Sequence, residues 1–156
     1  MTTPTTGQAA RAGRTLLAGA LLGLGTAAFV DEAVFHQLLH WHHFYDRSTD
    51  EAGLVSDGLF HAFSWFATVA SLFGVSELRR EGAFWPRRFA AGWLSGAGFF
   101  QLYDGLVQHK VFGLHQIRYG VDLLAYDLVW NLVAVVLVAV GAVLLLRPGR
   151  AGRPRA

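Results

Sequence analysis

The sequence has no cysteine, a single methionine and few charged residues. Of its 156 residues none is Cys, one is Met, and 15% are Asp, Glu, Lys or Arg. Without Cys the chain can form no disulfide framework, zinc finger or iron–sulfur cluster. A bound metal would have to take nitrogen and oxygen ligands, because soft sulfur ligands are missing. The hydrophobic share of 53% excludes a disordered chain and is too high for an ordinary soluble domain.

Four long, mostly apolar stretches predict transmembrane helices. A helix needs about 20 residues to cross a hydrocarbon core of about 30 Å. Stretches such as Val133–Leu146 and Ala62–Val75 also lack the polar stripe of a soluble amphipathic helix. We therefore expect an all-α bundle of four transmembrane helices in a lipid bilayer. The four segments are about Leu16–Trp41, Asp57–Leu78, Phe89–His109 and Tyr126–Leu146.

Positive residues collect at one end of the predicted helices. Ten of the 13 Lys and Arg residues lie before the first segment, between the second and third, or after the fourth. Because positive residues in short loops are retained in the cytoplasm, both termini are expected on the cytoplasmic side. The His-rich ends then face outward. The Arg residues after the last segment are explained by this topology, so we expect no nucleic-acid partner.

Two parts of the sequence resemble each other. A shift of 73 residues aligns 14–42 with 87–115, and ten of these 29 positions are identical, where chance would give about two. A shift of 70 aligns the second segment more weakly with the fourth, matching Asp57 to Asp127 and His61 to Asn131. We interpret the pattern as two tandem helix-hairpin repeats related by a pseudo-two-fold axis along the membrane normal.

The domain organisation follows from this repeat. We expect a single integral membrane domain over residues 1–156, with repeat 1 at about 14–78 and repeat 2 at about 87–147. The ends of the chain, 1–13 and 148–156, are expected to be flexible tails.

Each repeat contains a pair of glycines four residues apart. Gly19 and Gly23 recur as Gly92 and Gly96 at the shift of 73. Small residues at this spacing let helix backbones approach closely in lipid. They predict close packing of the first and third helices in their cytoplasmic halves. Glycine-rich faces of this kind are also candidate contacts for a homo-oligomer or another membrane protein.

Carboxylates and imidazoles from all four segments fall at one depth, in the outer third of the predicted bundle. At about 1.5 Å per residue, Asp31 and His36 lie about 22 and 30 Å along the first segment. Charged groups near hydrocarbon cost about 2.5–3.5 kcal/mol each on insertion scales and therefore need partners. A metal ion suits converging carboxylates and neutral imidazoles. The predicted metal ligands are His36, His61, His109, Asp57, Asp104 and Asp127.

Further polar residues near this layer could hold those ligands in place or replace them. For His42, His43 and His115, which lie beyond the expected lipid boundary, contact with the outer water is an equally good explanation. Asp31 and His36 are five residues apart, about 140° around an α-helix, so a straight helix cannot direct both at one ion. A bulge would correct this, or Asp31 would orient an imidazole of a neighbouring helix. The supporting or alternative ligands are Asp31, Glu32, His40, His42, His115, Asn131, Gln101, Gln108, Tyr103 and Tyr126.

The ligand types suit iron, zinc, manganese or copper(II), and the duplicated half-sites suggest two ions, or one ion on the axis. In an enzyme such a metal would activate water or dioxygen, as in a metal-dependent oxidoreductase or hydrolase. One alternative is a haem b protein with two axial His ligands, although several carboxylates at the same depth argue against it. Another is a metal-free proton or ion conduit, or an assembly partner, with a His–Asp network.

Three motifs resemble a bacterial integral-membrane family classed as a domain of unknown function. They are VFHQLLHWHHFYD at Val34–Asp46, SDGLFH at Ser56–His61, and FQLYDGLVQHKVFGLHQIRY at Phe100–Tyr119. The resemblance covers the chain apart from its tails and implies a small four-helix membrane protein without an established activity. With the predicted topology, it implies a multi-pass protein of the bacterial cytoplasmic (inner) membrane, with the site facing the extracytoplasmic side.

Overall fold

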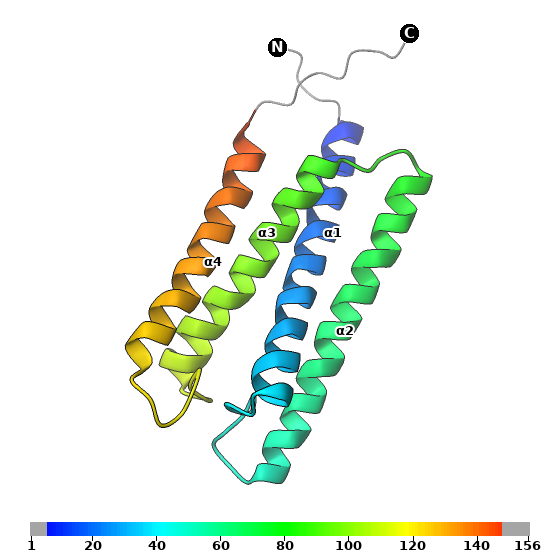
Figure 1. Ribbon diagram of the computed structural model, residues 1–156. Coiled ribbons are helices and arrows are strands. Elements are labelled where there is room, and N and C mark those ends of the chain that lie inside the picture. Colours follow the sequence, from blue (N-terminus) through cyan, green and yellow to red (C-terminus); the bar gives the residue numbers. More distant parts are fainter. Residues whose placement is uncertain (1–5, 148–156) are drawn as a thin grey trace.

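The computed structural model describes residues 6–147, which form long helical segments and no strand (Figure 1). The all-helical class is therefore confirmed. The expected tails at 1–5 and 148–156 lie outside the described residues, whereas residues 6–13 are already helical. The elements are α1 (Thr6–Asp31) continued by η1 (Glu32–Leu38), α2 (Asp50–Arg80), α3 (Pro86–Leu102) continued by η2 (Tyr103–Phe112), and α4 (Leu123–Leu146).

Two helices begin earlier than the apolar pattern indicates because polar residues cap them. The Thr49 side chain accepts a hydrogen bond from the backbone N–H of Ala52 and starts α2. Asp122 accepts from the N–H of Leu124 and starts α4. Capping satisfies N–H groups that have no partner within the helix, so a polar first turn can precede the apolar run.

Within residues 6–147, three helices are long and apolar enough to cross a membrane. They are Thr6–Leu38, Asp50–Arg80 and Leu123–Leu146. The third expected span, α3 continued by η2, is absent from this set because α3 is rich in small residues and η2 carries polar ones such as Asp104 and Lys110, which lower its mean hydropathy. Much of its surface is covered by neighbouring helices, and Ala91, Gly92 and Gly96 are buried. A helix covered by protein needs less apolar surface than one surrounded by lipid.

The helices contact one another in the order α2, α1, α3, α4. In Figure 1, α1 and α3 lie side by side in the middle, α2 packs on α1, and α4 packs on α3. Within residues 6–147, the backbone of α2 lies beside that of α1 and not beside α3 or α4, although the rings of Phe60 on α2 and Phe100 on α3 stack with centroids 5.8 Å apart. This differs from the expected bundle, in which four helices would close around a common core.

The paired glycines explain this order. A Cβ on Gly23 would overlap the backbone carbonyl oxygen of Trp93, and a Cβ on Gly96 would overlap that of Ala20. Gly19 and Gly92 make the same kind of contact with the opposite helix. The predicted close packing of the first and third helices is thus confirmed. Both glycine faces are occupied within one chain, so they are not free for the contact with a second chain that the sequence suggested.

At their lower ends in Figure 1, α1 and α3 continue as the π-helices η1 and η2. Hydrogen bonds in a π-helix join residues five apart, so such residues lie on one face instead of about 140° apart. Asp31 and His36 are brought together in this way, and so are Asp104 and His109. The five-residue spacing in the sequence is therefore the spacing that a π-helical turn requires.

We predict that Gly23→Ala and Gly96→Ala destabilise the protein. Each added methyl group would force the α1 and α3 backbones apart, and overpacking of this kind costs about 1–3 kcal/mol. Thermal unfolding in detergent should show a lower midpoint for both variants. Gly58→Ala is the matched control, because a Cβ on this exposed α2 glycine meets nothing within 4 Å. Equal midpoints for all three variants would contradict the packing argument.

Candidate metal centre

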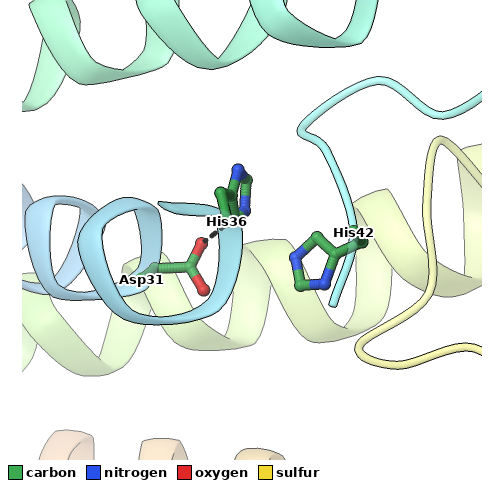
Figure 2. A group of neighbouring side chains, drawn as sticks. All are labelled: Asp31, His36 and His42. Atoms are coloured by element: carbon green, nitrogen blue, oxygen red, sulfur yellow. Dashed lines mark ion pairs between the residues drawn. The ribbon is translucent and has the colours of Figure 1, made fainter. Parts of the chain in front are cut away.

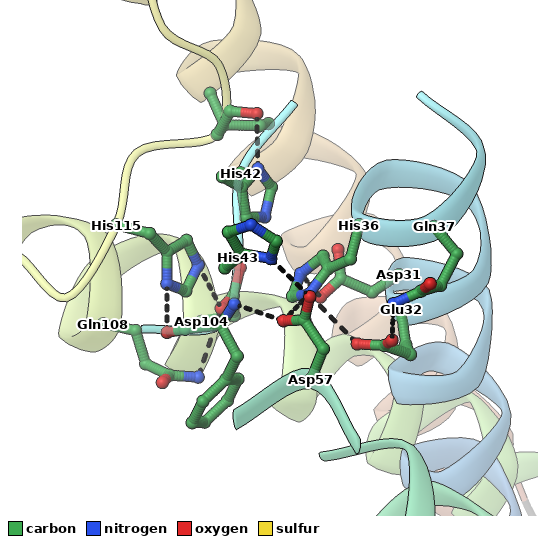
Figure 3. Close-up of polar contacts among 12 residues, drawn as sticks. Asp31, Glu32, His36, Gln37, His42, His43, Asp57, Asp104, Gln108 and His115 are labelled. Atoms are coloured by element: carbon green, nitrogen blue, oxygen red, sulfur yellow. Dashed lines mark hydrogen bonds and ion pairs between the residues drawn. The ribbon is translucent and has the colours of Figure 1, made fainter. Parts of the chain in front are cut away.

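Buried polar side chains gather at the end of the molecule opposite the start of α1 and the end of α4, where η1, η2 and the loops after them meet (Figure 3). None of these side chains belongs to a residue more than 6% exposed. Carboxylates this deeply buried require partners, because isolated charges are strongly disfavoured away from water. The residues are Asp31, Glu32, His36, His42, Asp57, Asp104, Gln108, His109 and His115.

One group consists of Asp31, His36 and His42 (Figure 2). Asp31 ends α1, His36 lies in η1, and His42 lies in the following loop. Asp31 Oδ2 is 3.7 Å from His36 Nε2, and the rings of His36 and His42 have centroids 4.4 Å apart. One ligand atom from each residue lies within 4.8 Å of the other two, a spacing that could hold a metal ion.

A second group consists of Asp104, His109 and His115, which the shift of 73 aligns with the first group. Asp104 Oδ2 is 3.1 Å from His109 Nε2, and Asp104 Oδ1 is 3.4 Å from His115 Nε2. The two groups touch, because the rings of His42 and His115 stack in parallel with centroids 4.6 Å apart. Six groups able to bind metal therefore adjoin one another.

Reciprocal hydrogen bonds orient His42 and His115. His42 Nδ1 lies 3.0 Å from the backbone oxygen of Ile117, and His115 Nδ1 lies 2.8 Å from that of Phe44. A carbonyl oxygen only accepts, so each ring carries its proton on Nδ1 and leaves the lone pair on Nε2. Both Nε2 atoms are buried and have no hydrogen-bond partner among the described residues.

The imidazole of His42 is held in its neutral form. Burial, followed by the proximity of His115 and His36, lowers the pKa of His42 from its ordinary 6.5 to about 2. Neutral imidazole is the form that binds metals.

Asp57, a predicted ligand, contacts the Nδ1 atoms of two imidazoles, those of His36 and His43. Its Oδ1 lies 3.0 Å from His36 Nδ1 and accepts the backbone N–H of Phe44 at 2.7 Å (Figure 3). Its Oδ2 lies 2.6 Å from His43 Nδ1. Glu32 Oε2 is also 3.0 Å from His36 Nδ1, so Glu32, His36 and Asp57 form a third group with the spacing of metal ligands.

Three of the predicted residues lie outside the cluster. His61 is exposed and its ring contacts Phe29, with centroids 5.5 Å apart. The buried face of α2 runs through Asp57, Phe60 and Ser64, and His61 falls to one side of it. Asp127 instead pairs with Lys110 at 2.6 Å. Asn131 donates to the backbone oxygen of Asp127 at 2.9 Å.

The remaining candidates divide in the same way. Gln108 is buried and donates to Asp104 Oδ1 at 3.2 Å, so it supports the second group. Tyr126 accepts a hydrogen bond from Arg118 at 2.7 Å. The structure records no contact between the two groups and three other candidates, which are His40, Tyr103 and Gln101. His40 and Tyr103 are exposed, and the backbone oxygen of Gln101 accepts from Trp130.

Sequence reasoning undervalued His42, His43 and His115. Depth counting placed them beyond the lipid boundary, but the chain leaves the helix after Leu38 and folds back over the helix ends. His42 and His115 are identical at the shift of 73, and this identity is the signal that could have found them.

The fold and the site define a helical membrane protein with a buried His and Asp cluster of metal-binding geometry. The chain belongs to the DUF2243 family, described as a predicted membrane protein, whose sequence profile matches residues 18–148. The match includes every member of the two groups and agrees with the resemblance seen in the motifs. The chain matches no curated protein and no solved structure.

We predict that the His42 ring stays neutral, with its proton on Nδ1, from about pH 8 to about pH 5, the interval in which an ordinary histidine takes up a proton. The reason is that burial and two neighbouring imidazoles lower its pKa far below that interval. Ring nitrogen chemical shifts of metal-free protein, measured by NMR, check this. A ring that becomes protonated near pH 6.5 would contradict the buried position of His42.

Proposed function

We propose that this protein is an integral membrane metalloprotein whose centre is formed by the two groups Asp31, His36, His42 and Asp104, His109, His115. One observation carries the proposal. The Nε2 atoms of all four imidazoles are buried and lack a hydrogen-bond partner among the described residues, and they adjoin two carboxylates. An unpaired buried polar atom is costly, and a bound cation would satisfy these atoms together.

Two ions fit the charge of the site better than one. Four carboxylates are buried there, while the orientation of His42 and His115 favours neutral imidazoles. Two divalent ions would balance four negative charges, whereas one would leave two uncompensated in a medium of low polarity. The duplicated Asp–His–His sets also supply one set for each ion. The four carboxylates are Asp31, Glu32, Asp57 and Asp104.

The ligand set indicates the chemistry. Imidazole and carboxylate without sulfur suit iron, zinc, manganese or copper(II). Such a centre would activate water or dioxygen, which places the protein among metal-dependent hydrolases or oxidoreductases if it is an enzyme.

We infer that all four helical segments cross a bacterial cytoplasmic membrane, with both termini inside and the centre toward the outer face. The continuous segment α3–η2 runs alongside α1 for most of its length in Figure 1, which supports a fourth crossing. The Arg residues at the end that carries the termini support the orientation. The matching of Asp31, His36 and His42 to Asp104, His109 and His115 supports a duplicated hairpin.

Haem is the weaker candidate. His42 and His115 stack face to face with centroids 4.6 Å apart, which leaves no room for a porphyrin between them. Carboxylates also adjoin His36 and His109, where a bis-His haem would need apolar surroundings. A metal-free relay would leave His42 Nε2 with neither a hydrogen bond nor an ion pair among the described residues.

Elemental analysis of the purified protein tests the proposal. We expect about two ions per chain, and we expect His36→Ala and His109→Ala to lower this content because each removes a ligand. His43→Ala should lower it less, since His43 contacts Asp57 and belongs to neither group. The exposed His61→Ala is the matched control and should retain full content.

Wild-type protein without stoichiometric metal would overturn the metal centre in favour of a metal-free network. A haem Soret band in the visible spectrum would overturn it in favour of haem. A larger loss of metal in His43→Ala than in His36→Ala would show that the centre lies nearer the outer loop.

The absence of Cys makes the orientation testable with single introduced cysteines. Ser48→Cys lies in the loop before α2, and Arg80→Cys lies at its other end, and both positions are exposed. A membrane-impermeant maleimide added to intact cells should label Ser48→Cys alone, and Arg80→Cys only after lysis. The reverse pattern would invert the proposed topology.

A further inference from the structure

We propose that the two halves of the centre are different cation sites. The half with Asp31, His36 and His42 binds its ion tightly, and the half with Asp104, His109 and His115 binds weakly and exchanges its ion. This inference rests on the proposed function, because it requires the centre to bind metal. It arises from the unequal surroundings of His36 and His109, which occupy matching positions in the sequence.

On the side away from the centre, His36 has one carboxylate as a hydrogen-bond partner and a second carboxylate at ion-pair distance. Its Nδ1 lies 3.0 Å from Asp57 Oδ1 and 3.0 Å from Glu32 Oε2 (Figure 3). Donation of Nδ1–H to a carboxylate fixes the ring and makes Nε2 a stronger metal ligand. Asp57 is itself fixed by His43 at 2.6 Å and by the N–H of Phe44 at 2.7 Å. His36 is therefore a preorganised ligand.

His109 lacks this support. Its Nδ1 is buried and has no hydrogen-bond partner in the part of the chain that the structure describes. Gly105 stands where the first half has Glu32, and Gln116 stands where it has His43. Gln116 donates to the backbone oxygen of His109 at 3.2 Å and so does not hold the imidazole. His109 is therefore the weaker ligand of the two.

The charged residues around the two halves also favour tighter cation binding in the first half. In the first half, Asp31, Glu32 and Asp57 contact His36, and none of them forms an ion pair with Lys or Arg within residues 6–147. In the second half, Asp127 takes the place of Asp57 at the shift of 70, but it pairs with Lys110 at 2.6 Å. This ion pair cancels the charge of Asp127, so the second half has fewer unpaired carboxylates to attract a cation.

Titration of the metal-free full chain with Co²⁺ in detergent tests this proposal, followed by visible absorption and calorimetry. We expect two binding steps in the wild type. Asp57→Asn should weaken the tighter step about 10–100-fold and change the d–d absorption of the Co²⁺ bound there. The reason is that the carboxylate hydrogen-bonded to His36 Nδ1 loses its charge. Asp57→Glu should restore part of both. Asp50→Asn is the matched control and should leave both steps unchanged, since Asp50 is an exposed carboxylate at the start of the same helix.

The weaker binding step serves as a control for folding. It should be retained in Asp57→Asn if this variant folds. If that variant does not fold, Glu32→Gln removes the other carboxylate behind His36 and should weaken the same step. Two equal steps in the wild type, or equal weakening of both steps in these variants, would overturn the inequality and leave the metal centre standing. A wild type that binds no Co²⁺ would overturn the proposed function and this inference with it.

Discussion

The close contact between the α1 and α3 backbones determines where every other part of the structure lies. At Gly23 and Gly96 a carbonyl oxygen of the opposite helix takes up the space of a side chain. Two helices this close leave no central space for other helices, so α2 and α4 pack on opposite outer sides. The same contact brings η1 and η2 together at the far end of the molecule (Figure 1). The cluster forms there because each of the two helix ends, with its π-helical turn, places an Asp and a His at the same point.

Burial of these groups depends on the loops that follow the π-helices. Each loop folds back over the helix ends and is held by the other, since the backbone N–H of Asp46 donates to the oxygen of Leu114 at 3.0 Å. His42 and His115 make the crossed contacts with Ile117 and Phe44. The loops therefore do two things at once. They exclude water from the carboxylates, and they direct two Nε2 lone pairs inward.

The sequence was sufficient to predict the apolar helices, the glycine contact, and the common depth of Asp31, His36, Asp104 and His109. These features depend on composition and on a count of residues along a helix. The five-residue spacing between Asp31 and His36 suggested a bulge as one of two explanations. Counting residues could not choose between them, because a π-helical turn changes the angle between residues and not their order. The place of His61 failed for a related reason. The spacing places His61 one turn after Asp57, but the face of α2 that becomes buried is set by contacts with α1.

The two halves differ in a way that separates side-chain roles from backbone roles. At the shift of 73, Asp31, His36 and His42 have identical counterparts, and each contributes a side-chain atom to the cluster. Phe44 and Ile117 also occupy matching positions and differ in side chain, yet each accepts the same kind of hydrogen bond through its carbonyl oxygen. A backbone contact of this kind does not depend on the side chain. Identity is also lost where Glu32 and His43 of the first half are matched by Gly105 and Gln116. Among the buried polar residues of the cluster, the ones that keep their identity at this shift are thus the six of the two groups whose spacing could hold a metal ion.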